Sequence, residues 1–177
     1  ADAAAAEAAA HLSRILAATS ASSAAAVPRI IYASRTHSQL RQVVRELRRT
    51  AHRPIVCTLG SREQMCIHPT VRAQRGAQQT ASCQALVAAD GCPHYNQLQD
   101  RKRREGGLLL NPEAPREAGE RTVPDIEDFV AEATKDKCCP FHFARELQQT
   151  AEVLFVPYNY LLDSRTREAL KISTQND

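Results

Sequence analysis

The sequence predicts an α/β fold in which a long insert, mostly helix and loop, interrupts a parallel sheet. Residues 29–59 alternate short β-branched runs with an amphipathic segment, residues 60–140 lose that rhythm, and it returns at residue 152. The chain has 177 residues, which is enough for one domain with an insertion.

The first 28 residues are rich in alanine. Residues 1–19 predict a helix because alanine is the strongest helix former, and Leu12, Ile15 and Leu16 supply a short apolar face. Residues 20–28 are small and lack periodicity, so we expect a flexible linker there.

A buried strand is predicted at residues 29–33, followed by a polar turn in which Thr36 or Ser38 could cap a helix. That helix is expected to run to about Arg49. Its apolar face has helical spacing and consists of Leu40, Val43, Val44 and Leu47. Residues 54–59 predict a second strand, which completes a βαβ unit with parallel strands.

Within residues 60–140, a helix is predicted only at 125–133, and a further helix is expected at 141–150. Residues 106–119 are interpreted as a loop, and Arg101–Arg104 as a basic run that either steers DNA or is a solvated loop. A segment with so little apolar patterning needs a cross-link or a metal to stay ordered.

The last part of the chain resumes the α/β pattern. Residues 153–156 predict a strand, and residues 157–163 a turn into a short helix that Tyr158 and Tyr160 anchor to the sheet. From Ser173 onward the residues are polar and form no closing element, so we expect the chain to be an internal part of a longer protein.

Composition narrows the classes of partner. A net charge of +3 permits a nucleic-acid partner without requiring one. The sequence contains no run of 18 apolar residues, so we expect no membrane span. The N-terminal alanine run contains Glu7 and does not resemble a secretory signal. Outside a secretory context, six cysteines indicate metal or redox chemistry more than disulfides.

Four cysteines are the candidate ligands of a metal centre: Cys66, Cys83, Cys92 and Cys139. They lack the two-to-four-residue pairing of structural zinc sites, whereas a four-iron cluster takes one thiolate at each corner. Spacing alone leaves a cluster, zinc and unrelated buried thiols open, with His68 and His94 as further zinc ligands. Cys57 is interpreted as a core residue and Cys138 as a neighbour that does not bind metal.

Four motifs occur in one order along the chain: Ile30–Leu40, Gly60–Pro69, Cys139–Arg145 and Val156–Asp163. Together they resemble the iron–sulfur DNA helicases of superfamily 2, the XPD/FANCJ-like group, whose motif Ia matches the first of them. The resemblance implies a partial RecA-like helicase motor domain interrupted by an iron–sulfur domain. Its implied parts are an Ala-rich helix and linker (1–28), motor domain 1 (29–59), the iron–sulfur cluster domain (60–140), and a return to the motor domain that ends before the DEAH box (141–177).

The same resemblance implies roles for particular residues. By the resemblance, the four cysteines are the ligands of one [4Fe–4S] cluster. Arg62 is implied to lie beside the cluster and to offset its charge without binding the metal. In motif Ia, the implied contacts to the DNA backbone are Ser34, Arg35, Thr36 and His37. From the residues alone, the segment could bind a phosphate oxygen or form a helix cap with a solvated arginine, and the cap is favoured.

The implied whole protein is an ATP-dependent 5′-to-3′ DNA helicase of the nucleus, acting in DNA repair and telomere maintenance on single-stranded or junction DNA, with ATP and Mg²⁺. This chain lacks a Walker A loop, since Gly106-Gly107 is not one, and it lacks a DEAH box. We therefore expect no catalytic residue and no ATP hydrolysis in these 177 residues. The alternatives are a zinc-binding interaction module without catalytic activity and a DNA-binding segment whose cysteines are incidental.

Overall fold

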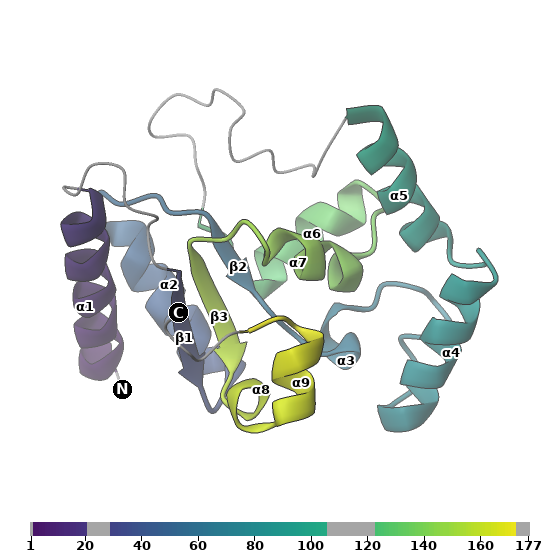
Figure 1. Cartoon of the computed structure of the whole chain (residues 1–177), viewed down its shortest axis with the longest axis horizontal. Coiled ribbons are helices and arrows are strands. Elements are labelled where there is room, and N and C mark those ends of the chain that lie inside the picture. Colours follow the sequence, from purple (N-terminus) through teal and green to yellow (C-terminus); the bar gives the residue numbers. More distant parts are fainter. Residues whose placement is uncertain (1, 21–28, 106–122, 173–177) are drawn as a thin grey trace. The chain divides into compact units, whose positions relative to one another are not determined.

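The computed structural model describes residues 2–20, 29–105 and 123–172, and these form two compact units (Figure 1). Unit 1 contains the described residues up to Thr58, residues 123–125 and residues 151–172. Unit 2 contains residues 59–105 and 126–150. Most of the predicted linker at 20–28 and the predicted loop at 106–119 lie outside the described residues.

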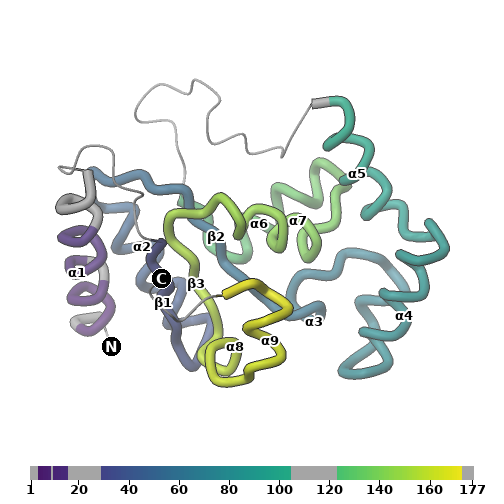
Figure 2. Tube along the Cα trace, viewed as in Figure 1, coloured from purple at the N-terminus to yellow at the C-terminus, as the bar shows by residue number. Residues whose placement is uncertain are grey.

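Unit 1 is built on a parallel sheet of three strands, β1 (Ile30–Ser34), β2 (Val56–Thr58) and β3 (Val153–Pro157). The strand order is β1-β3-β2, so the last strand in the sequence lies between the first two, as the trace in Figure 2 shows. The predicted parallel arrangement is confirmed. The two strands of the predicted βαβ unit are not direct neighbours, because β3 hydrogen-bonds to both.

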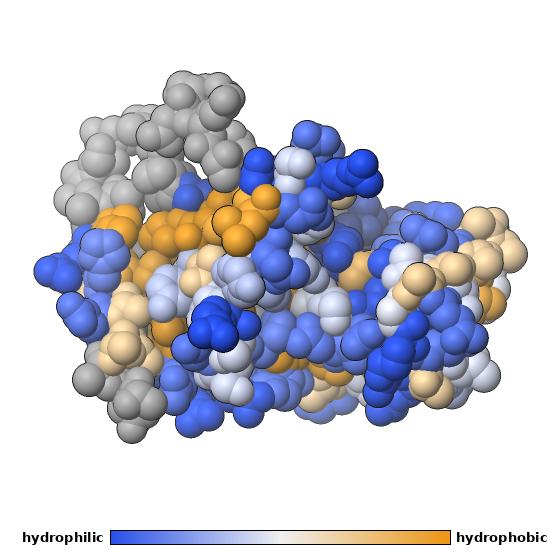
Figure 3. Space-filling view, turned by 90° about the horizontal axis from the view of Figure 1, so that it is seen from below, coloured by the Kyte–Doolittle hydropathy of each residue, from blue (hydrophilic) through white to orange (hydrophobic). Residues whose placement is uncertain are grey.

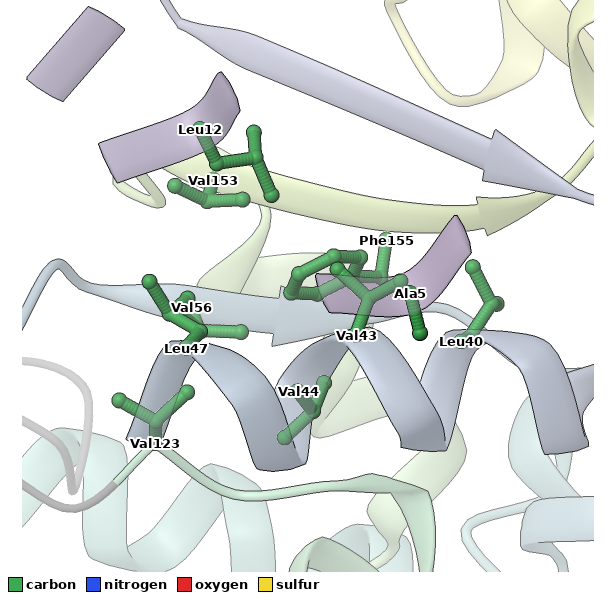
Figure 4. Packing of buried hydrophobic residues seen from close by; sticks show 10 residues of the cluster. All are labelled: Ala5, Leu12, Leu40, Val43, Val44, Leu47, Val56, Val123, Val153 and Phe155. Carbon is green, nitrogen blue, oxygen red and sulfur yellow. The ribbon is translucent and has the colours of Figure 1, made fainter. Parts of the chain in front are cut away.

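Helix α2 (His37–Arg49) packs its predicted apolar face on this sheet (Figure 4). Helix α1 (Asp2–Ser20) joins the same core through Ala5 and Leu12, of which Leu12 is 2% exposed. The buried cluster consists of Ala5, Leu12, Leu40, Val43, Val44, Leu47, Val56, Val123, Val153 and Phe155. Its members are aliphatic apart from one phenylalanine, as expected for a chain with 5% aromatic residues.

Two short helices follow β3, α8 (Asn159–Leu162) and α9 (Ser164–Ala169). The sequence predicted the first but not the second, which begins at the capping residue Asp163. The turn is attached to β1 through the backbone, because the Tyr158 amide donates to the Ser34 carbonyl at 2.9 Å. The prediction that the Tyr158 side chain anchors the turn was wrong, since that side chain is 46% exposed.

Unit 2 is helical: α3 (Arg62–Met65), α4 (Gly76–Ala88), α5 (Pro93–Glu105), α6 (Ile126–Lys135) and α7 (Pro140–Leu147). The sequence predicted α6 and α7 but missed the first three. Helices α4 and α5 lack a regular apolar stripe. The single fully buried residue of α4 is Gln79, whose side-chain amide donates to the Val71 carbonyl at 3.2 Å.

The basic run at 101–104 lies in the last turns of α5, so its interpretation as a loop was wrong. Arg101 pairs with Asp136 at 2.7 Å, and Lys102 pairs with Glu146 at 3.2 Å. These pairs join α5 to the end of α6 and to α7. Part of the run therefore has a structural role within unit 2.

The face of the molecule in Figure 3 is mainly hydrophilic, with its largest hydrophobic area on the side of the picture where α1, α2 and the sheet lie. Leu162, at 73% exposure, is the most exposed large apolar side chain of the described residues. In the part of the chain that the structure describes, no helix is both long and apolar enough to span a bilayer.

Candidate metal centre

The four candidate cysteines line one cavity in unit 2. Each comes from a different local context: Cys66 ends α3, Cys83 lies within α4, Cys92 directly precedes α5, and Cys139 is the N-cap residue of α7. The full lining is Cys66, Ile67, His68, Val71, Cys83, Leu86, Val87, Cys92, His94, Cys139 and His142. We call this the four-cysteine cavity.

The cavity has a volume of about 10 Å³ and is partly open to solvent. Cys92 and Cys139 are buried, each at 7% exposure, whereas Cys66 and Cys83 are half-buried. Among the described residues, no three His, Cys, Asp or Glu side chains are arranged to hold a metal ion. A four-iron cluster is larger than one ion and takes its thiolates at separate corners, so it suits a wider spacing.

The thiols of the cavity influence one another electrostatically. The pKa of Cys139 is raised from 9.0 to about 12, mainly by burial. The nearby thiols of Cys92 and Cys66 act in the same direction, and hydrogen bonds from backbone amides oppose them. Burial also raises the pKa of Cys66, with Cys83 and Cys92 adding to the effect. For Cys139 the difference corresponds to about 4 kcal/mol against the thiolate. A bound cationic centre is the factor that would favour thiolates here.

The other two cysteines lie away from the cavity. Cys57 is part of β2 in unit 1 and is 1% exposed, as expected of a core residue. Cys138 is also 1% exposed, and its thiol donates to the Asp136 carbonyl at 3.5 Å. Neither residue lines the cavity, although Cys138 directly precedes a residue that does.

Arg62 stacks on Phe141, with its guanidinium carbon 4.2 Å from the ring centroid. Arg145 stacks on the same ring at 3.5 Å. Arg62 also favours the thiolate of Cys66, since its charge acts to lower the pKa of that thiol. The predicted position of Arg62 beside the candidate ligands thus has a physical basis, in which one aromatic ring holds two cations near the cavity.

His142 is a cavity residue that the sequence analysis missed. Burial lowers its pKa to about 4, and the charges of Arg62 and Arg145 contribute. Its ring packs edge-on against Tyr95 at a centroid distance of 4.8 Å. The signal that could have found it is its spacing, because a residue three positions after Cys139 on a helix lies on the same face.

His68 and His94, the histidines of the zinc alternative, both line the four-cysteine cavity. Their ring centroids are 6.3 Å apart and the rings are nearly perpendicular. His94 Nδ1 lies 3.1 Å from the Lys137 carbonyl oxygen, and the His94 carbonyl accepts the Cys139 amide at 2.9 Å. These two hydrogen bonds join the first turn of α5 to the segment before α7.

The predicted DNA-contact residues lie in unit 1, where β1 ends and α2 begins. Thr36 caps α2: its hydroxyl accepts the Gln39 amide at 3.2 Å, and the Gln39 side chain accepts the Thr36 amide in return. Ser34 donates to the Gln39 side chain at 2.7 Å, while Arg35 is exposed and His37 is half-buried. The structure therefore gives this segment the helix-cap role expected from its residues.

Comparison with known proteins gives the family. The DEAD_2 model matches residues 32–177, so the chain belongs to the DEAD_2 family, and the resemblance inferred from the four motifs is confirmed.

Individual relatives include regulator of telomere elongation helicase 1 of Mus musculus, 46% identical over 147 residues, which are 82% of this chain and 11% of that protein. The Homo sapiens protein is 45% identical over 147 residues, again 82% of this chain and 11% of the relative. The homolog from Oryza sativa subsp. japonica is 45% identical over 151 residues, or 85% and 14%. The chain thus spans a small part of these relatives' length.

Proposed function

We propose that this chain is part of an ATP-dependent DNA helicase and carries its [4Fe–4S] cluster. The observation that supports the cluster most directly is the convergence of four cysteines, from four separate segments of unit 2, on one cavity. Membership of the DEAD_2 family and the likeness to telomere elongation helicases support the helicase class. When bound, the cluster would supply a covalent cross-link among four separate segments of unit 2.

In this proposal the cluster domain is residues 60–140, between two parts of motor domain 1 at 29–59 and 141–177. Cys66, Cys83, Cys92 and Cys139 provide the thiolates. Arg62 acts electrostatically on Cys66, and its positive charge would offset the negative charge of the thiolates and the cluster.

Elemental analysis tests the cluster directly. The chain is purified without oxygen, and iron, acid-labile sulfide and zinc are measured per chain. We expect four iron and four sulfide per chain. Cys83→Ser should lower the iron content, whereas the matched variant Cys138→Ser, which changes a thiol away from the cavity, should keep it. Wild-type protein without iron would refute the cluster.

For DNA binding, we propose that Ser34, Arg35, Thr36 and His37 contact the phosphate backbone of single-stranded or junction DNA. The exposed Arg35 at the N-terminus of α2 is suited to a phosphate oxygen. Arg35→Ala should weaken binding of a fluorescent single strand at low salt and reduce the salt dependence of its affinity. Arg49→Ala, at the other end of α2, is the matched control and should leave affinity nearly unchanged; an equal loss from both variants would contradict the assignment.

The whole protein is proposed to unwind DNA with 5′-to-3′ polarity using ATP and Mg²⁺, in DNA repair and telomere maintenance in the nucleus. The 177-residue chain has no Walker A or DEAH sequence, so we expect it to show no DNA-stimulated ATP hydrolysis by itself. A phosphate-release assay with and without single-stranded DNA checks this expectation, and DNA-stimulated turnover would overturn it.

A zinc-binding interaction module is the second candidate, and His94 is the observation in its favour. A histidine that ligates zinc commonly donates its other ring nitrogen to a carbonyl, which is the arrangement of His94 Nδ1 with Lys137. His68 suits zinc less well, because its Nδ1 accepts from the Val71 amide. About one zinc per chain without iron would favour this candidate over the cluster.

A further inference from the structure

The two most exposed large apolar side chains of the described residues lie on one short helix of unit 1. Tyr158 is 46% exposed and Leu162 is 73% exposed. Tyr158 is the N-cap residue of α8, and its carbonyl accepts the Leu162 amide at 3.3 Å. The two residues are therefore one helical turn apart and on the same side of α8. Much of the Tyr158 side chain is open to solvent.

Tyr158 lies beside Arg35 at the carboxyl edge of the parallel sheet. Pro157 of β3 is paired in register with Ser34 of β1, and the Tyr158 amide extends this ladder by donating to the Ser34 carbonyl at 2.9 Å. Tyr158 and Arg35 directly follow these paired residues, so they are neighbours where β1 and β3 end (Figure 1). Arg35 is exposed as well. Open α/β sheets bind their ligands at this edge, beyond the carboxyl ends of the strands.

Hydrogen bonds from the next helix hold α8 in place. The Arg167 guanidinium of α9 donates to the carbonyls of Leu161 and Leu162 in the last turn of α8. The Asp163 amide donates to the Asn159 carbonyl at 3.0 Å. A tyrosine has few rotatable bonds, so a tyrosine on a fixed backbone loses little conformational entropy when it binds a ligand.

An exposed aromatic ring next to an exposed cation matches the chemistry of single-stranded nucleic acid. The face of a base stacks on the ring, and a neighbouring phosphate pairs with the arginine. Two apolar side chains are too few for a stable protein interface, which buries about 800 Å² on each partner. We propose that Tyr158 stacks on a base of the single-stranded DNA whose phosphate backbone Arg35 contacts.

This inference rests on the proposed DNA contact of Arg35 and adds a residue that binds a base. Phosphate contacts do not distinguish single strands from duplexes by themselves, because both present a charged backbone. In a duplex the faces of the bases are already stacked on one another, so a protein ring has no base face to cover. Tyr158 would therefore give this edge of unit 1 a preference for single strands.

The experiment measures binding of the 177-residue chain to a fluorescent oligothymidine of about 12 nucleotides, a length within the range of single-strand binding sites. An abasic strand of the same length, which has the phosphates but no bases, is measured in parallel. Tyr158→Leu keeps an apolar side chain without the ring and should weaken binding of oligothymidine about fivefold or more. Binding of the abasic strand should change little. Tyr158→Phe keeps the ring and should stay near the wild-type affinity for both strands.

Salt dependence separates this contact from that of Arg35. Tyr158 carries no charge, so Tyr158→Leu should leave the slope of affinity against salt concentration unchanged, whereas Arg35→Ala should reduce it. Circular dichroism checks that the variants keep the fold.

Three results would overturn the stacking contact while the proposed DNA contact of Arg35 stands. They are unchanged oligothymidine binding in Tyr158→Leu, equal losses for oligothymidine and the abasic strand, and equal losses in Tyr158→Leu and Tyr158→Phe. A wild-type chain that binds neither strand at low salt would overturn both contacts.

Discussion

The two units of the chain are stabilised in different ways. In unit 1, one amphipathic helix, a second alanine-rich helix and three parallel strands share a continuous aliphatic core, in which Leu47 and Val153 are completely buried. The apolar side chains recur at the spacing of the element that carries them. Unit 1 is therefore ordered by the burial of apolar surface.

In unit 2, four separate segments each place a cysteine in one cavity. Helix α4, which carries Cys83, has weak apolar patterning. The other helices of unit 2 bury apolar side chains, such as Met65, Leu98 and Phe129, whereas Gln79 is the single buried residue of α4. Unit 2 thus has fewer means of holding α4 in place. The comparison predicts that unit 1 is destabilised when its apolar core is truncated. It also predicts that unit 2 is destabilised when the metal centre of the four cysteines is lost.

The largest effect is expected from Cys139→Ser. Cys139 is one of the two buried thiols of the cavity, and burial raises its pKa to about 12. Its backbone amide donates to the His94 carbonyl. Loss of this ligand should abolish iron binding and make unit 2 sensitive to protease, while unit 1 stays resistant. Limited proteolysis with mass spectrometry distinguishes the units, and intact unit 2 in the iron-free variant would remove the contrast between them.

Leu47→Ala is the corresponding change in unit 1. Leu47 is 0% exposed within the core, so truncation should cost about 2–5 kcal/mol of unfolding free energy through lost burial and a cavity. Urea unfolding followed by circular dichroism measures the change. Iron content should remain at the wild-type level if the units are stabilised separately, and a parallel loss of iron would show that they depend on each other.

The same contrast explains what the sequence could predict. The strands and α2 follow from periodicity, since Leu40, Val43 and Leu47 recur at helical spacing. The order β1-β3-β2 could not be predicted, because it depends on β3, more than 90 residues after β2, inserting between the first two strands. Helix α9 was missed because it is short and has no buried residue.

In unit 2, α4 and α5 were missed because their sequences show no apolar stripe to mark a helix. The four cysteines could be chosen from sequence order and the resemblance, but their convergence required coordinates. His142 was missed although it lies three positions after Cys139, because that spacing indicates a shared helix face without showing that the face lines a cavity. The roles of His68 and His94 depend on individual hydrogen bonds to Val71 and Lys137, which no pattern encodes.

Thr36→Ala tests the helix cap separately from DNA binding and should have a moderate effect. It removes the hydroxyl that accepts the Gln39 amide, so unit 1 should lose about 1 kcal/mol of unfolding free energy. Thr36→Ser keeps the hydroxyl and should retain most of that stability. Urea unfolding of the two variants gives the comparison, and equal stability of both would mean that the cap contributes little.

The smallest effect is expected at Asp163, which caps α9 at the exposed edge of unit 1. Hydrogen bonds from the Thr166 hydroxyl, and then from the Thr166 and Arg165 amides, lower the pKa of this carboxyl below 3.8. A carboxyl whose pKa is lower in the folded state adds stability above its unfolded pKa and loses that contribution as the pH falls through the folded value. Asp163→Asn keeps an oxygen acceptor without the charge, so it should be slightly less stable than the wild type at pH 7, and the difference should shrink toward pH 2. Urea unfolding at both pH values measures this, and a difference that grows in acid would contradict a role for the charge.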